Sequence, residues 1–180
     1  FEDDQFDHFL PLVWVRGVFE LKCGAVSLRE KIERAAGMSA SALLVRDYLT
    51  PVLSKRCGSA VLNDLSACAG EEVLFVNARV CGSHLSPPQQ RVAQWQGAQL
   101  AVWRTRDDVS GIRDYASLAA AAGRADRAEF AGKWFEYIWD VMLANPEEVA
   151  ADFKAAGRSG VYGKLHESSV VFGPREALFL

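Results

Sequence analysis

The sequence predicts an α/β domain in which helices cover both faces of an open, Rossmann-like, mostly parallel sheet. Short apolar runs alternate with segments that carry helix start and stop signals, which is typical of βαβ units. Half of the 180 residues are hydrophobic, which suffices for a sizeable core and is too much for a disordered chain. The length fits one domain.

Charge and hydropathy exclude several classes of partner. The net charge is -3 at pH 7 and no block of Lys and Arg occurs, so we expect no nucleic-acid partner and no membrane partner. No apolar run is long enough to span a bilayer. The four cysteines form no C-x-x-C pair and show no zinc-finger spacing to His. We therefore expect reduced, structural thiols of a cytoplasmic protein, with two disulfides as the alternative.

The first elements are a strand and a capped helix. The apolar residues 10–15 predict a strand, and a glycine follows them at position 17. Ser27 and Glu30 have the spacing of a capping box, and Gly37 is a typical helix end. We expect a helix between them.

The central elements alternate in the same way. We expect strands at 42–45, 73–76 and 98–104, because these segments are apolar and lie between turn residues. Thr50 with Pro51 predicts a short helix that ends by Gly58, and a second short helix is expected from the prolines at 87 and 88 towards Gly97.

The last elements are helical. Asp114 is positioned to cap the Ala-rich turn that follows it. A four-residue spacing then predicts one buried helical stripe made of Phe130, Trp134, Ile138 and Met142. A further helix is expected from Asn145 to Gly157. We expect Trp139 in the core, and the other tryptophans in the core or partly buried: Trp14, Trp95, Trp103 and Trp134.

The segment from Leu10 to Lys31 is the densest in potential chemistry. It predicts a strand, a glycine-broken loop with Arg16, Glu20 and Lys22, and then the capped helix. Open α/β sheets bind ligands in such loops at the carboxyl ends of strands, and cationic side chains can neutralise a phosphoryl group. The alternative is a set of solvated loop charges in which Glu20 pairs with Lys22 or Arg16.

Three stretches in this order resemble a known family. The chain reads "EDDQFDHFLPLVWVRGVFELKCGAVSLREKIE" where the family has "LLPLTLTRPVAELRxGILTIREKWE" after acidic residues. It reads "LFVNARVCG" for "LLINARVLP", and "IWDVMLANPEEVAADF" for "PWDLVxxNxxEIxxDF". It thus resembles the N-terminal domain of sugar nucleotidyltransferases related to the pyrophosphorylase half of bacterial UDP-N-acetylglucosamine pyrophosphorylase.

The resemblance implies a reaction and a set of residues. A sugar 1-phosphate attacks the α-phosphate of a nucleoside triphosphate and releases pyrophosphate, with Mg²⁺ bridging the phosphates. The catalytic residues implied are Arg16, Lys31 and Lys22. The substrate-binding residues implied are Leu12, Gly17, Glu20, Gly24, Asn77, Arg79 and Asp140. For Asn77 and Arg79 the alternative is a satisfied turn.

The chain departs from the family pattern at the expected metal site. Related enzymes have a G-x-G-T-R loop and a strand-end aspartate that holds Mg²⁺, whereas Asn77 stands in that place here, and Gly17 replaces a proline. A carboxylate from the run at residues 2–7 is the substitute we consider (Glu2, Asp3, Asp4 or Asp7). The alternative function is a catalytically degenerate nucleotide-sugar binding or scaffold domain of a larger acyltransferase-like protein.

The resemblance also implies a domain division. We expect a nucleotidyltransferase-like domain at 1–160 and terminal strands at 161–180. In relatives such strands lead into a left-handed β-helix, which this chain does not contain, and the full-length protein is then expected to be a homotrimer.

Overall fold

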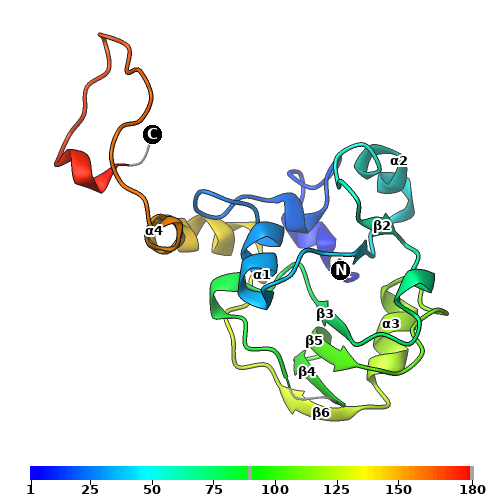
Figure 1. Ribbon diagram of the computed structural model, residues 1–180. Helices are drawn as coiled ribbons and strands as arrows, with labels where there is room; N and C mark the ends of the chain where they lie inside the picture. Colours follow the sequence, from blue (N-terminus) through cyan, green and yellow to red (C-terminus); the bar gives the residue numbers. More distant parts are fainter. Residues whose placement is uncertain (89–90, 179–180) are drawn as a thin grey trace.

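A computed structural model describes residues 1–88 and 91–178, which form a mixed α/β body and a C-terminal extension (Figure 1). The body contains two sheets. The smaller one pairs β1 (Ala42–Leu43) in parallel with β2 (Val61–Leu62). The larger one has the strand order β3-β5-β4-β6.

The larger sheet is not mostly parallel, so this part of the predicted fold is wrong. It consists of β3 (Val73–Val76), β4 (Val92–Gln96), β5 (Gln99–Thr105) and β6 (Asp126–Glu129). Strand β5 runs antiparallel to both β3 and β4, and only β4 and β6 are parallel in this sheet. The expected strands at 73–76 and 98–104 are confirmed as β3 and β5.

The error in pairing comes from the segment before Gly97. We expected a helix there, but residues 92–96 form β4, and Gly97 with a φ of 57° turns the chain directly into β5. Ala93 and Trp95 are buried while Val92, Gln94 and Gln96 are less buried, which is strand periodicity. Residues 89 and 90, which also belong to the expected helix, lie outside the described residues.

Two predicted helices are confirmed, α1 (Leu28–Ala36) and α2 (Thr50–Leu53). The Ala-rich segment, expected as a turn capped by Asp114, forms the helix α3 (Tyr115–Ala122). Ser27 and Glu30 make the expected capping box, and Gly37 closes α1 in the left-handed conformation. Asp114 caps α3 through the backbone N–H of Ser117. Short 3-10 turns connect the elements: η1 (Phe6–Phe9), η2 (Val18–Glu20), η3 (Asp47–Leu49), η4 (Ser66–Cys68), η5 (Gly82–His84) and η6 (Arg175–Ala177).

The expected strand at 10–15 and the expected helical stripe are both wrong. Residues 10–15 form turns between η1 and η2, since they pair with no strand. Helix α4 (Ile138–Ala156) starts eight residues later than the stripe requires and continues through Pro146. Phe130 and Trp134 therefore precede the helix, and Met142 is 71% exposed.

Helices do cover both faces of the larger sheet. On one face Phe75 and Trp103 pack with Leu118 of α3. On the other face Val76 and Val102 pack with Phe130, and Ile32 of α1 reaches the same cluster. The alternation along β3 and β5 produces these two cores, because successive side chains of a strand point to opposite faces.

The first residues connect the two sheets. The Phe1 ammonium donates to the Val76 carbonyl at 2.8 Å, and the Ala78 N–H donates to the Phe1 carbonyl at 2.8 Å, which is the reciprocal pattern of parallel pairing. On the other side, the Glu2 N–H donates to the Leu44 carbonyl at 3.0 Å. Residues 1–3 thus lie between the sheets, and the chain leaves this position towards the turns at 10–17.

The C-terminal extension after α4 projects away from the body (Figure 1). Its described residues, 158–178, form loops and the turn η6, and the division at residue 160 stays a prediction. All four cysteines are free thiols. Among the described residues, no helix has the length and apolar character to cross a bilayer.

Ser27→Ala is expected to lower the free energy of unfolding by about 1 kcal/mol, because the Ser27 hydroxyl accepts the Glu30 N–H at the start of α1. Urea denaturation measures this change. The matched control is exposed Ser59→Ala, which removes a hydroxyl outside any helix start and should change stability by less than about 0.5 kcal/mol. Equal effects of the two substitutions would contradict the capping role.

Candidate functional site

The turns at 10–17 are held in place by the buried Glu2 carboxylate and the half-buried Arg46 guanidinium. The Glu2 carboxylate accepts the Val18 N–H at 2.8 Å and pairs with the Arg46 guanidinium at 3.1 Å. Arg46 in turn donates to the carbonyls of Val13 and Arg16, both at 2.9 Å. The turn backbone is therefore fixed by groups outside it, which leaves its own side chains available.

These turns present an exposed apolar and cationic surface. Leu12, Trp14 and Val15 are 53%, 59% and 60% exposed, and the Arg16 side chain is exposed beside them. The expected place of Trp14 in the core is wrong. An indole can stack on a flat ring, and a guanidinium binds phosphate oxygens in a bidentate manner, so this surface suits a nucleotide.

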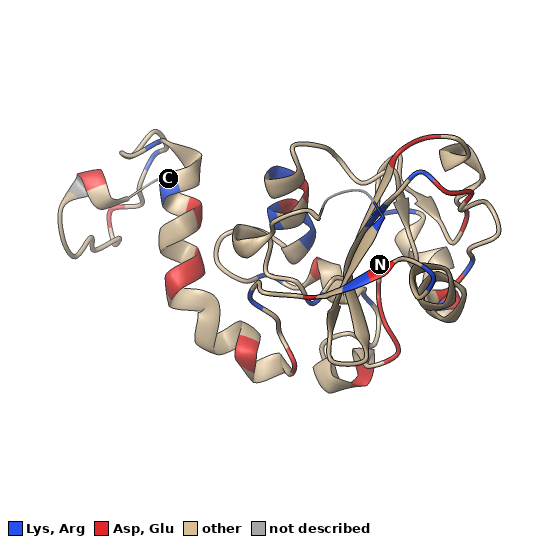
Figure 2. Ribbon diagram, turned by 90° about the horizontal axis from the view of Figure 1, so that it is seen from below, with Lys and Arg blue, Asp and Glu red and all other residues tan. Residues whose placement is uncertain are grey.

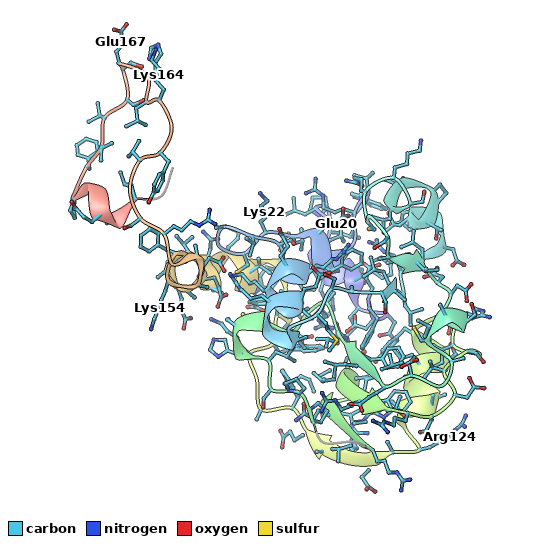
Figure 3. The ribbon with its side chains drawn as sticks, viewed as in Figure 1. Glu20, Lys22, Arg124, Lys154, Lys164 and Glu167 are labelled. Atoms are coloured by element: carbon cyan, nitrogen blue, oxygen red, sulfur yellow. The ribbon has the colours of Figure 1, made fainter. Side chains whose placement is uncertain are left out.

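Gly17 and Glu20 shape the end of the turns. The Gly17 N–H donates to the Glu20 carboxylate at 3.0 Å, and a Cβ at Gly17 would lie 2.5 Å from the Phe19 ring. Glu20 pairs with Arg56 at 3.8 Å, not with Lys22 or Arg16 as expected. Arg56 also donates to the Val15 carbonyl at 2.6 Å. Glu20 and Lys22 lie on the same side of the body (Figure 3).

Lys31 is buried in ion pairs. Its ammonium lies 2.6 Å from the Asp152 carboxylate and 2.9 Å from the Glu148 carboxylate, and Arg34 also pairs with Asp152. Lys31 and Arg34 of α1 thus pair with acidic residues of α4. Figure 2 shows where basic and acidic residues lie along the ribbon. A contact between Lys31 and a triphosphate would require both ion pairs to open, so that role stays a prediction.

The pairing shifts the pKa values of these groups. Burial alone raises the pKa of Glu148 and Asp152, but hydrogen bonds from Lys31, joined by Ser83 at Glu148 and by Arg34 at Asp152, outweigh it and leave both pKa values lowered. Burial lowers the pKa of Lys31, and the two carboxylates more than compensate. All three groups are therefore charged at neutral pH.

Gly24 lets a tight turn approach α4. Its N–H donates to the Asn145 side chain at 2.7 Å, and the next N–H, of Ala25, donates to Asp152 at 2.9 Å. Gly24 has a φ of 84°, and a Cβ there would lie 2.4 Å from the Asp152 carboxylate and 2.8 Å from the Glu148 backbone. The first and third family stretches thus meet at this contact, beside exposed Lys22.

Asn77 and Arg79 are buried at the end of β3. The Asn77 amide donates to Asp3 and to the Leu100 carbonyl, both at 2.9 Å, and its oxygen accepts the Arg79 N–H at 3.0 Å. The Arg79 guanidinium pairs with Asp3 at 3.1 Å and with Glu136 at 2.8 Å. Both side chains are satisfied internally, as the alternative of a satisfied turn expects, and their substrate-binding role stays a prediction.

Asp140 caps α4, and a stack of three rings lies near it, of which only Trp139 is exposed. Its carboxylate accepts the N–H groups of Glu136 and Tyr137, each at 2.8 Å. Tyr137 stacks between His8 and Trp139, with ring centroids 4.5 Å apart on both sides. Trp139 is 53% exposed, so its expected place near the core is wrong.

The predicted site residues therefore fall into three groups. Leu12, Arg16, Gly17 and Glu20 lie on the turns, Lys22, Gly24 and Lys31 lie at the contact with α4, and Asn77, Arg79 and Asp140 lie at the end of β3 and the start of α4. Sequence reasoning missed the residues that hold these groups. For Glu148 and Asp152 a signal existed, since a spacing of four places both on one face of α4. For Arg46 and Arg56 we find none.

The described carboxylates limit where Mg²⁺ could bind. Glu2 and Asp3 are buried and paired with Arg46 and Arg79, which leaves Asp4 and Asp7 as the exposed carboxylates of the acidic run. One group of three potential ligands lies together among the described residues: Cys81, His84 and Glu148, with ligand atoms within 4.8 Å of one another. It offers sulfur and nitrogen, which do not fit Mg²⁺, since that ion requires oxygen ligands.

A cavity of about 340 Å³ lies between the two sheets. Leu43 and Val61 of the smaller sheet and Val73 and Phe75 of the larger sheet line it, together with Phe1. None of the predicted site residues lines this cavity. We therefore place the candidate site at the turns, where exposed cationic and aromatic groups meet, and not at the largely apolar cavity.

Gly24→Ala is expected to lower the free energy of unfolding by more than about 3 kcal/mol, because the methyl group adds a clash with the α4 backbone to the strain of a positive φ. The control is Gly37→Ala, which has a φ of 70° but open space around the added methyl, and should cost only about 1 kcal/mol. Chemical denaturation of both variants measures the difference. Similar losses would show that the close approach to α4 is unimportant.

Acid is expected to destabilise the fold through Glu148 and Asp152. Their pKa values are below the ordinary 4.5 and 3.8 in the folded state, so the unfolded chain binds protons first as the pH falls. The stabilisation is full above about pH 5 and is lost progressively below it. Urea denaturation from pH 7 to pH 3 measures this loss, which Asp152→Asn should reduce and exposed Asp126→Asn should not.

Comparison with known proteins gives one assignment. A family described as "Sugar nucleotidyl transferase" matches residues 1–159, which include all three groups of predicted site residues. No curated protein matches the chain. Since the match spans most of the chain, the protein belongs to the sugar nucleotidyl transferase family.

Proposed function

We propose that the turns at 10–17 bind a nucleoside triphosphate and that the protein transfers its nucleotidyl group to a sugar 1-phosphate, releasing pyrophosphate. The observation that carries this proposal is exposed Arg16 beside exposed Trp14, on a backbone that Arg46 fixes from outside. Family membership supports nucleotidyl transfer to a sugar in general. The specific substrates and the relation to UDP-N-acetylglucosamine pyrophosphorylases are part of the proposal.

The position of the turns suits this reaction. They follow residues 1–3, which lie between the two sheets, and ligands of α/β proteins bind beyond the carboxyl ends of such central segments. Arg16 neutralises charge on the triphosphate, and Lys22, exposed near the contact with α4, does so on either substrate. Little covalent chemistry is required of the protein, since positioning and charge neutralisation dominate phosphoryl and nucleotidyl transfer.

The buried residues act as positioning residues in this proposal. Lys31 holds α1 against α4, while Asn77 and Arg79 hold residue Asp3 at the end of the central segment. Leu12, Gly17, Glu20 and Gly24 shape the substrate-binding surface, and Asp140 orders the start of α4. Mg²⁺, when bound, would neutralise the phosphates, and Asp4 and Asp7 are the exposed carboxylates that could hold it. A cytoplasmic location and a homotrimeric full-length protein stay predictions.

Arg16→Ala is expected to lower the rate of pyrophosphate release by about a hundredfold while leaving the melting temperature unchanged, because the Arg16 side chain is exposed and its carbonyl still accepts from Arg46. The assay mixes UTP or dTTP, Mg²⁺ and a panel of sugar 1-phosphates with the protein. The control is Arg124→Ala, an exposed arginine at the far end of the body (Figure 3).

Two other outcomes decide against parts of the proposal. Thermal stabilisation by a nucleotide or nucleotide sugar, lost in Arg16→Ala but without pyrophosphate release, would support the alternative of a binding or scaffold domain. If a nucleotide or nucleotide sugar at millimolar concentration causes neither thermal stabilisation nor pyrophosphate release, the nucleotide site at these turns is rejected.

A further inference from the structure

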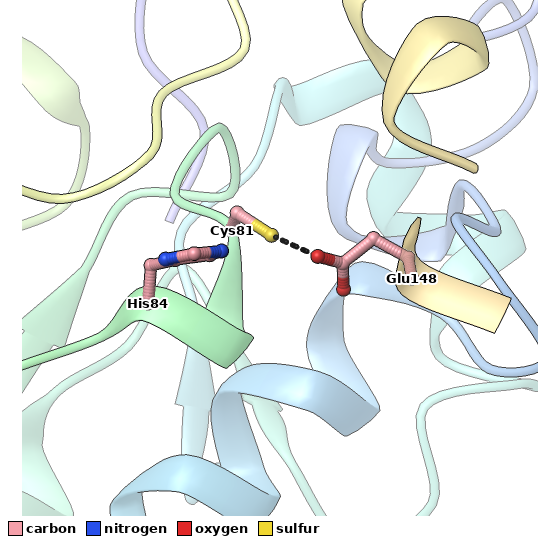
Figure 4. A group of neighbouring side chains, drawn as sticks. All are labelled: Cys81, His84 and Glu148. Carbon is pink, nitrogen blue, oxygen red and sulfur yellow. Dashed lines mark hydrogen bonds between the residues drawn. The ribbon is translucent and has the colours of Figure 1, made fainter. Parts of the chain in front are cut away.

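We propose that Cys81, His84 and Glu148 form a binding site for a divalent transition-metal ion of the Zn²⁺ class. The site is separate from the turns at 10–17 and does not depend on the proposed function. The sulfur of Cys81, a ring nitrogen of His84 and a carboxylate oxygen of Glu148 lie within 4.8 Å of one another (Figure 4).

Three elements fix the ligands. Cys81 directly precedes the turn η5, which ends with His84, so that the two lie three positions apart on one tight turn. Gly82 between them packs directly on α1, where a Cβ would lie 2.4 Å from the Lys31 backbone. Glu148 comes from α4 on the other side. The site therefore joins a surface turn to α4 beside the first helix.

The donor set is typical of zinc. Thiolate sulfur, imidazole nitrogen and carboxylate oxygen are the ligands that Zn²⁺ takes in proteins, and three protein ligands with one open position are a common arrangement. The Cys81 sulfur lies 3.3 Å from Glu148 Oε1, and the Ser83 hydroxyl donates to the same oxygen at 2.8 Å. A metal ion between Cys81, His84 and this oxygen would replace the bond that the thiol makes.

The carboxylate is already oriented for this role. Glu148 Oε2 faces the Lys31 ammonium at 2.9 Å, so Oε1 is the oxygen turned towards Cys81. Metal-binding carboxylates are commonly held by such a partner on the other oxygen. Lys31 is itself balanced by Asp152, so Glu148 retains negative charge to offer a cation.

Charge and access are compatible with metal entry. Burial, more than any other factor, raises the pKa of the Cys81 thiol, so metal binding would displace its proton. Two further charges act on the cluster: Lys133 interacts with Cys81 and Glu148, and exposed Glu147 interacts with His84 and Glu148. Lys133 and Glu147 pair with each other at 2.6 Å. Cys81 and Glu148 are buried whereas His84 is exposed, so the site opens to solvent on the histidine side.

Titration of the full chain with Co²⁺ tests the site. A thiolate bound to Co²⁺ gives a characteristic charge-transfer absorption, which we expect in the reduced protein and which Zn²⁺, but not excess Mg²⁺, should abolish by displacement. His84→Ala should weaken Co²⁺ binding by at least about tenfold, and Cys81→Ser should remove the absorption. The matched control is Cys68→Ser, which removes the half-buried cysteine of η4 and should leave the titration unchanged.

A variant at an exposed ligand and a second measurement keep the test decisive even if a variant at a buried ligand does not fold. His84 is exposed, so His84→Ala is expected to fold even if Glu148→Gln, which breaks a buried ion pair, does not. A melting temperature raised by Zn²⁺ in the unaltered chain and not in His84→Ala would support the site independently. Absence of the absorption at millimolar Co²⁺, or equal binding by His84→Ala, would overturn it.

Discussion

The buried charge cluster of Lys31, Glu148 and Asp152 is the constraint on which the rest of the arrangement depends. It joins α1 to α4, elements that are more than a hundred positions apart in the chain. Removing one member would leave a buried charge without a partner, which typically costs about 3–5 kcal/mol. Asp152 also accepts the Ala25 N–H of the Gly24 turn, and the Lys31 ammonium holds one oxygen of Glu148, which leaves the other oxygen turned towards Cys81.

A second cluster of buried charges holds residues 1–3 in their position between the two sheets. Asp3 accepts from both Asn77 and Arg79, and Glu2 holds Arg46, so the acidic residues at the start of the chain serve mainly as internal anchors. The turns at 10–17 make local backbone hydrogen bonds, such as Leu12 N–H to the Phe9 carbonyl, and Glu2 with Arg46 adds contacts from outside the turns. The exposed side chains of these turns are therefore available for ligands, while the residues beneath them maintain the shape.

Because some motif residues are buried anchors and others are exposed, the family motifs have two different roles. Many of the residues that carry the resemblance contact one another: Gly24 and Lys31 of the first stretch touch Asn145, Glu148 and Asp152 of the third. Such motifs preserve an interface between segments as well as any chemistry. Arg16 differs from them, because its side chain is exposed and its backbone is held by another residue. Arg16 and Lys22 are thus exposed cationic residues of the first stretch, whereas Lys31 is buried.

Local signals in the sequence determined the capped starts of α1 and α3, the start of α2 at Thr50 and Pro51, and the buried character of β3 and β5. Capping and apolar runs act over a few residues, so they could be recognised without the fold. Tertiary structure alone decided that residues 92–96 pair as a strand, that β5 runs antiparallel, and that Lys31 is enclosed by α4. Those outcomes depend on which distant segments become neighbours in the fold. The stability of a strand depends on the strands it pairs with, and the cost of burying an ammonium depends on the carboxylates that pair with it.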